Sequence, residues 1–542
     1  MKLSVLIFFY LISNLLFGQI TLISPNYLDT LNYRQIMFEY EQVEGAQSYQ
    51  IEISTSLDQF EKHIFIKKKI AGLAIRIDSG FNFGNHYYWR AKGFKKNGSI
   101  LTTSNISNFY IAKSNWSSSL LIKQETKSNN PLKMYNGLIV YDYGVIANKK
   151  GEVLWFLPDN DGASRNLNLN PDGTITYNGS NGSFETDLNG KKTWKAPFFL
   201  NDTTLIKNYH HDFKKLKNGH FLCVAEKKLS YETDKLFSVI FEIDRKNNLY
   251  WKWDEEPIYY KRMDNVLSNH INAIDIDTDR GIVYISNRNL NSINKIRTAS
   301  DTSYIIKYIG NINNRFFSGQ HSLSLLPNKN LLLFNNNTID KESPNSVSSI
   351  QEINQVTSSD TFVNIVWEYK FSFPKMEENK CAKAGDADLL PNGNILITSG
   401  ANNRVFEVNR KKEIIWECRS FRRDKETDIF TPQSSYRSHY CSSLYPNYFT
   451  IQYKSSKNLK LNKEQEVKLI INNNGSDDDE YTVNVTSNNT VIEECSSTIA
   501  VAAQKSKEET IKIKTKNMDE IIVNITSKTN PLKTRNIVYR VN

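Results

Sequence analysis

Cysteine is scarce: the 542 residues include five, Cys223, Cys381, Cys418, Cys441 and Cys495. An odd number leaves at least one thiol unpaired within a single chain. No two cysteines form a C-x-x-C pair, which argues against a dithiol redox site and a zinc ribbon. Cys223 lies in the apolar run HFLCVAE and is expected to be a buried free thiol. Cys381, Cys418 and Cys441 could supply one disulfide, but the sequence does not select the pair.

Long apolar runs are absent after the N-terminus. Residues 1–18 have the order of a signal peptide, with Lys2 as the positive start, Leu3–Leu16 as the apolar stretch and Gly18 before the expected cut at Gln19. No cysteine follows that cut, so a lipid-anchored N-terminus is not expected. No later run is long enough to span a bilayer. The pattern predicts an exported protein, periplasmic or secreted, without a membrane span.

A helical hydrophobic period is also missing. Aromatic and β-branched residues recur in short runs broken by Asn, Asp, Gly and Lys, which predicts an all-β chain. A hydrophobic content of 39% with 12% aromatic residues supports packed cores. The formal net charge is +10, but the basic residues are spread over most turns. This spread argues against nucleic-acid binding and is compatible with small anionic substrates.

One unit recurs between residues 113 and 447. It consists of a strand, a polar turn and a strand, and most copies are followed by a second hairpin that ends in Trp. The first hairpins read GLIVYDYGVIANKKGEVLWFL, NLNLNPDGTITYN, HHDFKKLKNGHFLCVA, HINAIDIDTDRGIVYIS, QHSLSLLPNKNLLLFN and GDADLLPNGNILITSG, and the closing residues are Trp155, Trp194, Trp253, Trp367 and Trp416. Six units of about four strands predict a six-bladed β-propeller, which closes on itself and protects its sheet edges.

The regions on either side of the repeats also read as β-structure. In residues 19–112, YQIEIS and YYWRAKGF resemble the C and F strands of fibronectin type III domains, which implies a β-sandwich. Residues 448–542 contain the alternating runs KLIINN, YTVNVTS, ETIKIKT and EIIVNITS, and are expected to form a small immunoglobulin-like β-sandwich. Modules of these kinds do not by themselves indicate a function.

Three of the eight histidines occupy equivalent places in consecutive repeats. His211 precedes Asn218 by seven residues, and His321 precedes Asn328 by the same number. His270 lies at nearly the same place in the intervening repeat, which has a longer turn. Because the innermost strands of a propeller line its channel, the three rings are expected to face one another at one mouth. The alternative is that each histidine caps its own blade.

The hairpin that follows His270 adds two further polar groups. Its second strand delivers Arg288, and antiparallel pairing returns this residue to the end of the hairpin where His270 lies. Asn272 shares a face with His270 if strand alternation is regular. An imidazole, an amide and a guanidinium at one mouth suit a small oxyanion.

Taken together, these motifs resemble the bacterial aryl-sulfate sulfotransferases. The resemblance rests on HHD before a K-N-G turn, H-x-N with an arginine eighteen residues after the histidine, QH before a P-N turn, and FNNN. Members of that family are exported six-bladed propellers with an N-terminal β-sandwich, and they transfer sulfuryl groups between phenols without a nucleotide donor. The resemblance therefore implies a phenolic sulfate donor, a phenol acceptor, no cofactor and a ping-pong mechanism. A homodimer is one option for the assembly. The C-terminal sandwich is not part of the family pattern.

The resemblance also implies residue roles. His321 matches the histidine that is transiently sulfated, His211, His270 and Arg288 match the positions that bind sulfate and handle protons, and Asn272 matches the asparagine beside them. His210 competes with His211, and the alignment of the repeats favours His211. Tyr436 is a candidate for substrate binding, although a closing outer strand also explains it. His220 and His439 are expected to have no catalytic part.

The sequence implies no metal site. The three histidines at the mouth could hold zinc, but Arg288 disfavours a cation there, and Asp212 is expected to point to the opposite face. Two other functions remain open. One is a sulfate-ester hydrolase that uses water as acceptor at the same site, and the other is a non-catalytic propeller that binds anionic ligands or a partner protein. The three aligned histidines argue against the second.

Overall fold

The computed structural model describes residues 19–127, 134–158, 164–228, 236–255, 258–260, 265–267, 269–298, 304–310, 316–338, 346–355, 364–487, 490–491, 496–514 and 520–542. The predicted signal peptide and Cys495 lie outside these residues. The prediction of an all-β chain is confirmed, since the described segments are mostly strand and α1 (Asn115–Ser119) is a single turn of helix. Short 3₁₀ turns occur at Phe60–His63, Met376–Asn379 and Gly400–Asn402. Within the described residues, no helix has both the length and the apolar character needed to cross a bilayer.

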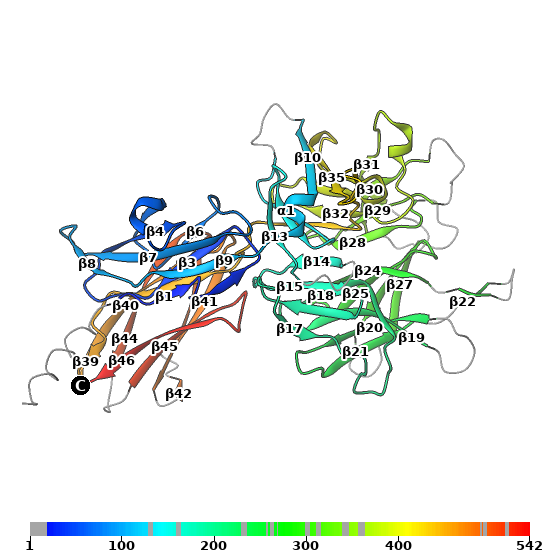
Figure 1. Cartoon of the computed structure of the whole chain (residues 1–542). Helices are drawn as coiled ribbons and strands as arrows, with labels where there is room; N and C mark the ends of the chain where they lie inside the picture. Colours follow the sequence, from blue (N-terminus) through cyan, green and yellow to red (C-terminus); the bar gives the residue numbers. More distant parts are fainter. Residues whose placement is uncertain are drawn as a thin grey trace, which may run out of the picture. The chain divides into compact units, whose positions relative to one another are not determined.

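The chain divides into two compact units (Figure 1). One combines the two terminal regions, up to Ser114 and from Leu444 onward, and the other runs from Asn115 to Ser443. The terminal unit consists of two pairs of sheets, one from each end of the chain.

The N-terminal pair packs a three-stranded sheet on a six-stranded one. The smaller sheet has the order β1 (Leu22–Ser24), β3 (Ile36–Tyr40), β6 (Ala74–Ile77). The larger has the order β2 (Asp29–Leu31), β9 (Ser107–Ile111), β7 (His86–Phe94), β4 (Ser48–Ser54), β5 (Ile64–Ile70), with β8 (Ile100–Thr103) beside β7. Phe38 of β3 and Trp89 of β7 are fully buried, with ring centroids 5.0 Å apart. In β7, buried residues alternate with more exposed ones because one face of the strand packs on this core.

The C-terminal pair has a similar form. One sheet has the order β38 (Phe449–Tyr453), β40 (Glu464–Asn473), β44 (Ser506–Lys514). The other has the order β39 (Asn458–Leu459), β46 (Thr534–Val541), β45 (Glu520–Ser527), β41 (Asp479–Ser487), β42 (Thr490–Val491), with β43 (Ser497–Val501) beside β41. Polar contacts join the two pairs: Arg535 lies 2.8 Å from Glu39, and Tyr453 and Gln42 exchange two hydrogen bonds of 2.9 Å.

In its described residues, the second unit contains six sheets of at least four antiparallel strands and one separate two-stranded hairpin. Four of them use consecutive strands, and their members are β14 (Arg165–Leu169), β15 (Ile175–Gly179), β16 (Gly182–Thr186) and β17 (Lys192–Lys195); β18 (Asn208–Lys215), β19 (Phe221–Lys228), β20 (Leu236–Ile243) and β21 (Leu249–Asp254); β24 (Ile271–Asp277), β25 (Ile282–Asn287), β26 (Ser292–Arg297) and β27 (Tyr304–Gly310); β28 (His321–Leu325), β29 (Leu331–Asn335), β30 (Ser349–Asn354) and β31 (Asn364–Lys370). A small hairpin, β22 (Ile258–Tyr260) and β23 (Asn265–Leu267), precedes β24.

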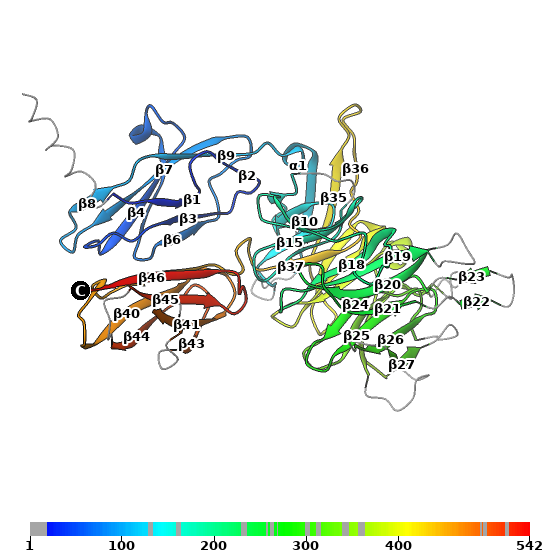
Figure 2. The same ribbon diagram turned by 90° about the horizontal axis from the view of Figure 1, so that it is seen from below.

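The other two sheets combine strands from both ends of this unit. β37 (Ser438–Cys441) pairs with β11 (Leu138–Tyr141) and so completes the sheet of β12 (Val145–Asn148) and β13 (Val153–Phe156). β10 (Leu120–Thr126) pairs with β35 (Ile414–Arg423), beside it in Figures 1 and 2, and extends the sheet of β32 (Asp386–Leu389), β33 (Ile395–Ser399), β34 (Arg404–Val408) and β36 (Phe430–Pro432).

One strand from each of the six sheets contacts its counterparts in the two neighbouring sheets, so that β14, β18, β24, β28, β32 and β37 form a closed cycle. The apolar cores lie between consecutive sheets. For example, Val224 and Trp251 of one sheet pack with Ile274 and Val283 of the next, and each such side chain contributes about 1.5–3 kcal/mol on burial.

The closing tryptophans lie on β13, β17, β21 and β31, which are edge strands of their sheets, and on β35, which lies between β34 and β10. The indoles of Trp155, Trp367 and Trp416 donate hydrogen bonds to backbone carbonyls of the neighbouring sheet, at Leu188, Arg410 and Lys149. The recurring Trp therefore joins sheet to sheet.

The described cysteines form no disulfide. Cys223 is a buried free thiol, as predicted, and Cys381 and Cys418 are also buried free thiols. The disulfide considered for Cys381, Cys418 and Cys441 is therefore not formed.

Candidate functional site

The first strands of four neighbouring sheets are irregular at corresponding places. The pairing of β14, β18, β24 and β28 with their neighbours is interrupted near the start of each strand. Four residues there adopt left-handed φ values, Asn166 (52°), His211 (56°), His270 (53°) and Ser322 (49°). Such a conformation costs a residue with a side chain about 1–3 kcal/mol. Bulges of this kind re-aim side chains. His211 and His270 face each other, whereas Asn166 and Ser322 line a cavity together with His439.

Four histidines and Tyr436 form a contiguous group of side chains. The ring of His211 lies 4.9 Å from that of His270 and 6.0 Å from that of Tyr436. The ring of Tyr436 lies 5.9 Å from that of His321. His210 contacts His211, with ring centroids 4.8 Å apart and a hydrogen bond between their Nδ1 atoms. Five of the residues singled out from the sequence thus converge from β18, from β28 and from the segments just before β24 and β37.

The hydrogen bonds of His321 define which nitrogen carries its proton. Nδ1 lies 2.7 Å from Asn336 Oδ1 and 3.0 Å from the Gly319 carbonyl. Asn336 Nδ2 donates to the carbonyls of Cys381 and Ala384, at 2.7 and 2.8 Å, which fixes Oδ1 as the atom that faces the histidine. Both partners of Nδ1 are acceptors, so Nδ1 carries the hydrogen and Nε2 presents its lone pair.

Gln320 and His321, the QH pair of the sequence, have different structural roles. Gln320 is fully buried, and its amide group donates to Ser286 Oγ and to the carbonyls of Asn287 and Ser292, at 3.1–3.2 Å. These bonds reach the neighbouring sheet and fix the backbone just before His321. The glutamine therefore anchors the strand, while the histidine faces the mouth.

All four histidines at the mouth are held neutral. Burial lowers the pKa of His321 to about 3, and the positive charges of Arg288 and Arg437 act in the same direction. Burial also lowers the pKa of His210 to about 3, that of His211 well below its usual value, and that of His270, where Arg288 contributes. Neutral imidazoles can act as nucleophiles and as proton acceptors.

Arg288 occupies the place that the hairpin pattern predicts. The backbone N–H of Arg288 donates to the His270 carbonyl at 3.2 Å. The positive charge of its side chain lowers the pKa values of both His270 and His321. The guanidinium donates a hydrogen bond of 3.3 Å to Asn289. The mouth thus combines neutral imidazoles with a permanent positive charge.

Tyr436 is positioned by a buried carboxylate that the sequence did not reveal. Asp142 accepts hydrogen bonds from the N–H groups of Tyr436 and Arg437 at 3.0–3.1 Å and from Ser435 Oγ at 2.6 Å. Burial raises the pKa of Asp142 to about 6 although these bonds oppose the shift. Burial also raises the pKa of Tyr436 to about 12, and its hydroxyl has no hydrogen-bond partner in the described part of the chain.

Two polar residues hold the layer beneath the mouth. Asn272 Nδ2 donates to the Gln320 carbonyl at 2.7 Å, so the bulge directs this amide to the neighbouring sheet rather than along the face of His270. Asp212 accepts from Asn166 Nδ2 at 2.8 Å and from the Ile274 N–H at 2.9 Å, and it pairs with Arg437 at 3.3 Å. Asp212 therefore points away from the histidines, as expected.

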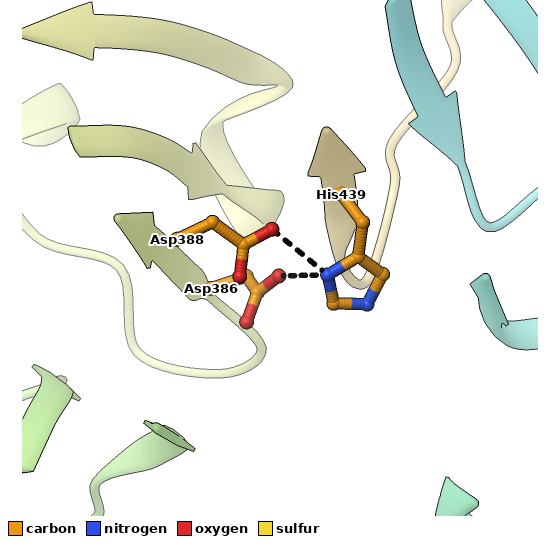
Figure 3. A group of neighbouring side chains, drawn as sticks. All are labelled: Asp386, Asp388 and His439. Carbon is orange, nitrogen blue, oxygen red and sulfur yellow. Dashed lines mark hydrogen bonds and ion pairs between the residues drawn. The ribbon is translucent and has the colours of Figure 1, made fainter. Parts of the chain in front are cut away.

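The remaining two histidines of the second unit lie elsewhere. His220 pairs with Glu242 at 2.7 Å in a turn. His439 on β37 faces Asp386 and Asp388 of β32 (Figure 3). Burial alone would lower the pKa of His439, but the two carboxylates outweigh it and raise this pKa to about 9.

Comparison with known proteins gives one family. A model of the family described as Arylsulfotransferase (ASST) matches residues 119–445, a span close to the second compact unit. No curated protein matches the chain.

Solved structures give only weak likenesses. The CARDB domain of a Pyrococcus furiosus protein is 17% identical and covers 18% of this chain and 89% of its own, with a TM-score of 0.16. A Bacteroides fragilis protein described as a candidate 6-phosphogluconolactonase is 12% identical and covers 74% and 100%, with a TM-score of 0.26. The extracellular domain of a candidate hybrid two-component system protein from B. thetaiotaomicron is 10% identical and covers 96% and 69%, with a TM-score of 0.29. These scores are too low to carry an argument.

Proposed function

The chain belongs to the arylsulfotransferase family, and from this premise we propose that it moves a sulfuryl group from a phenolic sulfate ester to a phenolic acceptor, without a nucleotide donor, through a sulfated His321. The observation that carries the proposal is the state of His321. Its Nδ1 hydrogen is held by Asn336 and Gly319, and burial keeps the ring neutral, so Nε2 is available for attack.

In the first half-reaction, the Nε2 lone pair of His321 forms a bond to sulfur, and the bond from sulfur to the aryl oxygen breaks. The electron pair leaves with the phenolate, which takes a proton from His211 or His270. The sulfated ring gains positive charge, and the oxygens of Asn336 and Gly319 on its Nδ1 hydrogen stabilise that charge. An aryl leaving group makes this step easier because its phenolate is a weak base.

The second half-reaction reverses these roles. The hydroxyl of the acceptor phenol gives its proton to the same imidazole, its oxygen bonds to sulfur, and the electron pair of the nitrogen–sulfur bond returns to Nε2. His211 and His270 are neutral in the empty mouth, and a bound sulfate would raise their pKa values because its negative charge favours the imidazolium. The substrate itself would thus prepare the proton donor.

Arg288 would bind two peripheral oxygens of the sulfuryl group, on which charge accumulates during transfer. Its side chain lies close enough to influence the pKa values of both His270 and His321. We propose that His210, Tyr436 and Asn272 line or support the substrate site. The unpartnered hydroxyl of Tyr436 suits a hydrogen bond to the phenolic oxygen or to the sulfuryl group.

The proposal extends to architecture and location. The six sheets with their closed cycle of strands support a six-bladed β-propeller, residues 113–447, as the catalytic domain. The two pairs of sheets at the ends support a fibronectin III-like sandwich at 19–112 and an immunoglobulin-like sandwich at 448–542. Residues 1–18 would direct export to the periplasm or the extracellular space.

The test uses p-nitrophenyl sulfate with and without phenol. Release of p-nitrophenol that requires phenol supports the transferase. Release that is indifferent to phenol points to a hydrolase at the same site, and absence of release with retained donor binding points to a non-catalytic binding protein. Either of the last two results would overturn the proposed activity.

A further inference from the structure

A second polar cluster lies on the strands that close the cycle of sheets. Asp386 and Asp388 come from β32, and His439 comes from β37 (Figure 3). His439 Nδ1 lies 3.0 Å from Asp388 Oδ2 and 3.2 Å from Asp386 Oδ2, and the three atoms lie within 4.8 Å of one another. We propose that these three side chains bind one divalent transition-metal ion, such as zinc.

The atom types and spacings suit such an ion. Zinc takes imidazole nitrogen at about 2.0–2.1 Å and carboxylate oxygen at about 2.0–2.2 Å. Two ligands of one ion are then about 3.0–3.5 Å apart for octahedral to tetrahedral angles, which agrees with the separations from His439 Nδ1. The imidazole favours a transition metal over calcium or magnesium, which prefer oxygen ligands throughout.

The other nitrogen of His439 is held as in many metal sites. Nε2 lies 3.3 Å from Asn166 Oδ1. Asn166 Nδ2 donates to Asp212 Oδ1 and to the Phe213 carbonyl, so Oδ1 is the atom left to accept. Nε2 therefore carries a hydrogen, and Nδ1 is directed at the two carboxylates. A hydrogen bond of this kind fixes the orientation of a ligand histidine.

An independent observation is the buried carboxylate oxygen of Asp386. His439 Nδ1 can give at most one hydrogen, and its hydrogen bond goes to Asp388. Asp386 is 3% exposed, and its Oδ2 accepts no hydrogen bond within the described residues, because its approach to His439 has the geometry of an ion pair only. A buried carboxylate oxygen without such a bond is costly. A divalent ion would satisfy both carboxylates and the imidazole.

The surrounding charges leave a place for a cation. Arg437 is paired with Asp212, and Lys214 lies 3.0 Å from Asp275. A divalent ion bound by Asp386, Asp388 and His439 would displace the hydrogen from His439 Nδ1, because a ligand imidazole must present its lone pair to the metal. The cluster lines a cavity of about 300 Å³, through which an ion and its remaining water ligands can enter.

The ion would cross-link two sheets of the second unit. β32 is the edge strand of the sheet that also contains β33, β34, β35 and β10, and β37 completes the sheet of β11, β12 and β13. One ion would therefore join the two sheets at the place where the cycle closes, and it would bind the folded chain alone. Binding of this kind raises the melting temperature in proportion to the logarithm of ion concentration.

The experiment uses the full chain after dialysis against a chelator. Zinc chloride is titrated by calorimetry, and metal content is measured after desalting. One zinc per chain is expected, with a rise of several degrees in Tm. Asp388→Asn and His439→Gln should each weaken zinc binding by about 100-fold, since each removes one of three ligands. His220→Gln, which changes another carboxylate-paired histidine, should bind zinc as the unchanged chain does.

The histidines of the mouth are the competing zinc site. The double variant His211→Asn, His270→Asn should keep the zinc, and excess calcium should not displace it. Loss of zinc in that double variant with retention in Asp388→Asn would overturn the proposal, as would absence of zinc binding by the unchanged chain. Because the readout is metal binding and Tm, either result leaves the proposed sulfuryl transfer untouched.

Discussion

The histidines at the mouth and the single His439 on the closing strands have opposite electrostatic environments. At the mouth, burial and Arg288 lower the pKa values of His270 and His321. On the closing strands, Asp386 and Asp388 raise the pKa of His439 to about 9 despite its burial. The residue type is the same, so the difference lies in the neighbours. Burial alone favours neutral imidazole, and it takes two carboxylates to reverse that preference.

The backbone differs in the same way. His211 and His270 have left-handed φ values and lie at bulges, whereas His439 lies within the regular pairing of β37 with β11. A strained backbone persists where the surrounding structure holds it. The strained backbone at the mouth is typical of a reactive site. The regular pairing around His439 is typical of a structural contact between sheets.

The largest expected effect is at His321. His321→Asn keeps the size and polarity but removes the proposed nucleophile, so transfer should fall by at least about 10³-fold. Initial-rate plots of the unchanged enzyme at several acceptor concentrations should be parallel lines. Donor alone should add a sulfuryl mass to the peptide QHSLSLLPNK, and acceptor should remove it. A label on another peptide, or transfer by the variant, would assign the nucleophile elsewhere. His220→Asn is the matched control.

The next largest effect is expected at Arg288. A lysine at this position distinguishes the contribution of the paired guanidinium N–H groups from that of the positive charge alone. Arg288→Lys keeps the positive charge but loses the paired N–H groups, so kcat/KM should fall by about 10²-fold. Steady-state kinetics with p-nitrophenyl sulfate measures the loss. A variant with nearly normal turnover would remove Arg288 from the sulfuryl site.

A smaller effect is expected when a carboxylate is placed beside a histidine of the mouth, as Asp386 and Asp388 lie beside His439. Asn336→Asp places a carboxylate beside His321 Nδ1, and this charge favours the imidazolium and raises its pKa. The nucleophile is then lost at a higher pH, so the acid limb of the kcat/KM profile should move up by about one unit or more. Asn335→Asp, next in the chain, is the comparison. An unchanged acid limb in Asn336→Asp would show that His321 does not control it.

The smallest effect concerns stability. The folded pKa of His210 is about 3, below the ordinary value, so this group contributes stability that is present above pH 6.5 and is lost as pH falls towards 3. Between pH 6.5 and 5 the loss is about 2 kcal/mol. Asp142, with its raised pKa of about 6, acts in the opposite direction. His210→Gln should therefore flatten the fall of Tm on acidification, and an equal fall in both proteins would contradict this assignment.

Much of the site was predictable because it lies on repeated hairpins. The spacing of His211 and His321 from their turns indicated that they share a place, and the length of one hairpin brought Arg288 to His270. Asn336 was visible only as part of FNNN. Its role depends on contacts with Cys381 and Ala384, which are distant in sequence.

The sequence by itself determined the strand pattern, the six repeats, the closing tryptophans and the histidines that share one mouth, because each depends on alternation and turn spacing within a single hairpin. Only the tertiary structure decided the bulges, the proton position on His321, the support of Tyr436 by Asp142, and the meeting of Asp386 and Asp388 with His439. These depend on neighbours from other sheets, since hydrogen bonds and charges act through space and strand order along the chain does not state which atoms will meet.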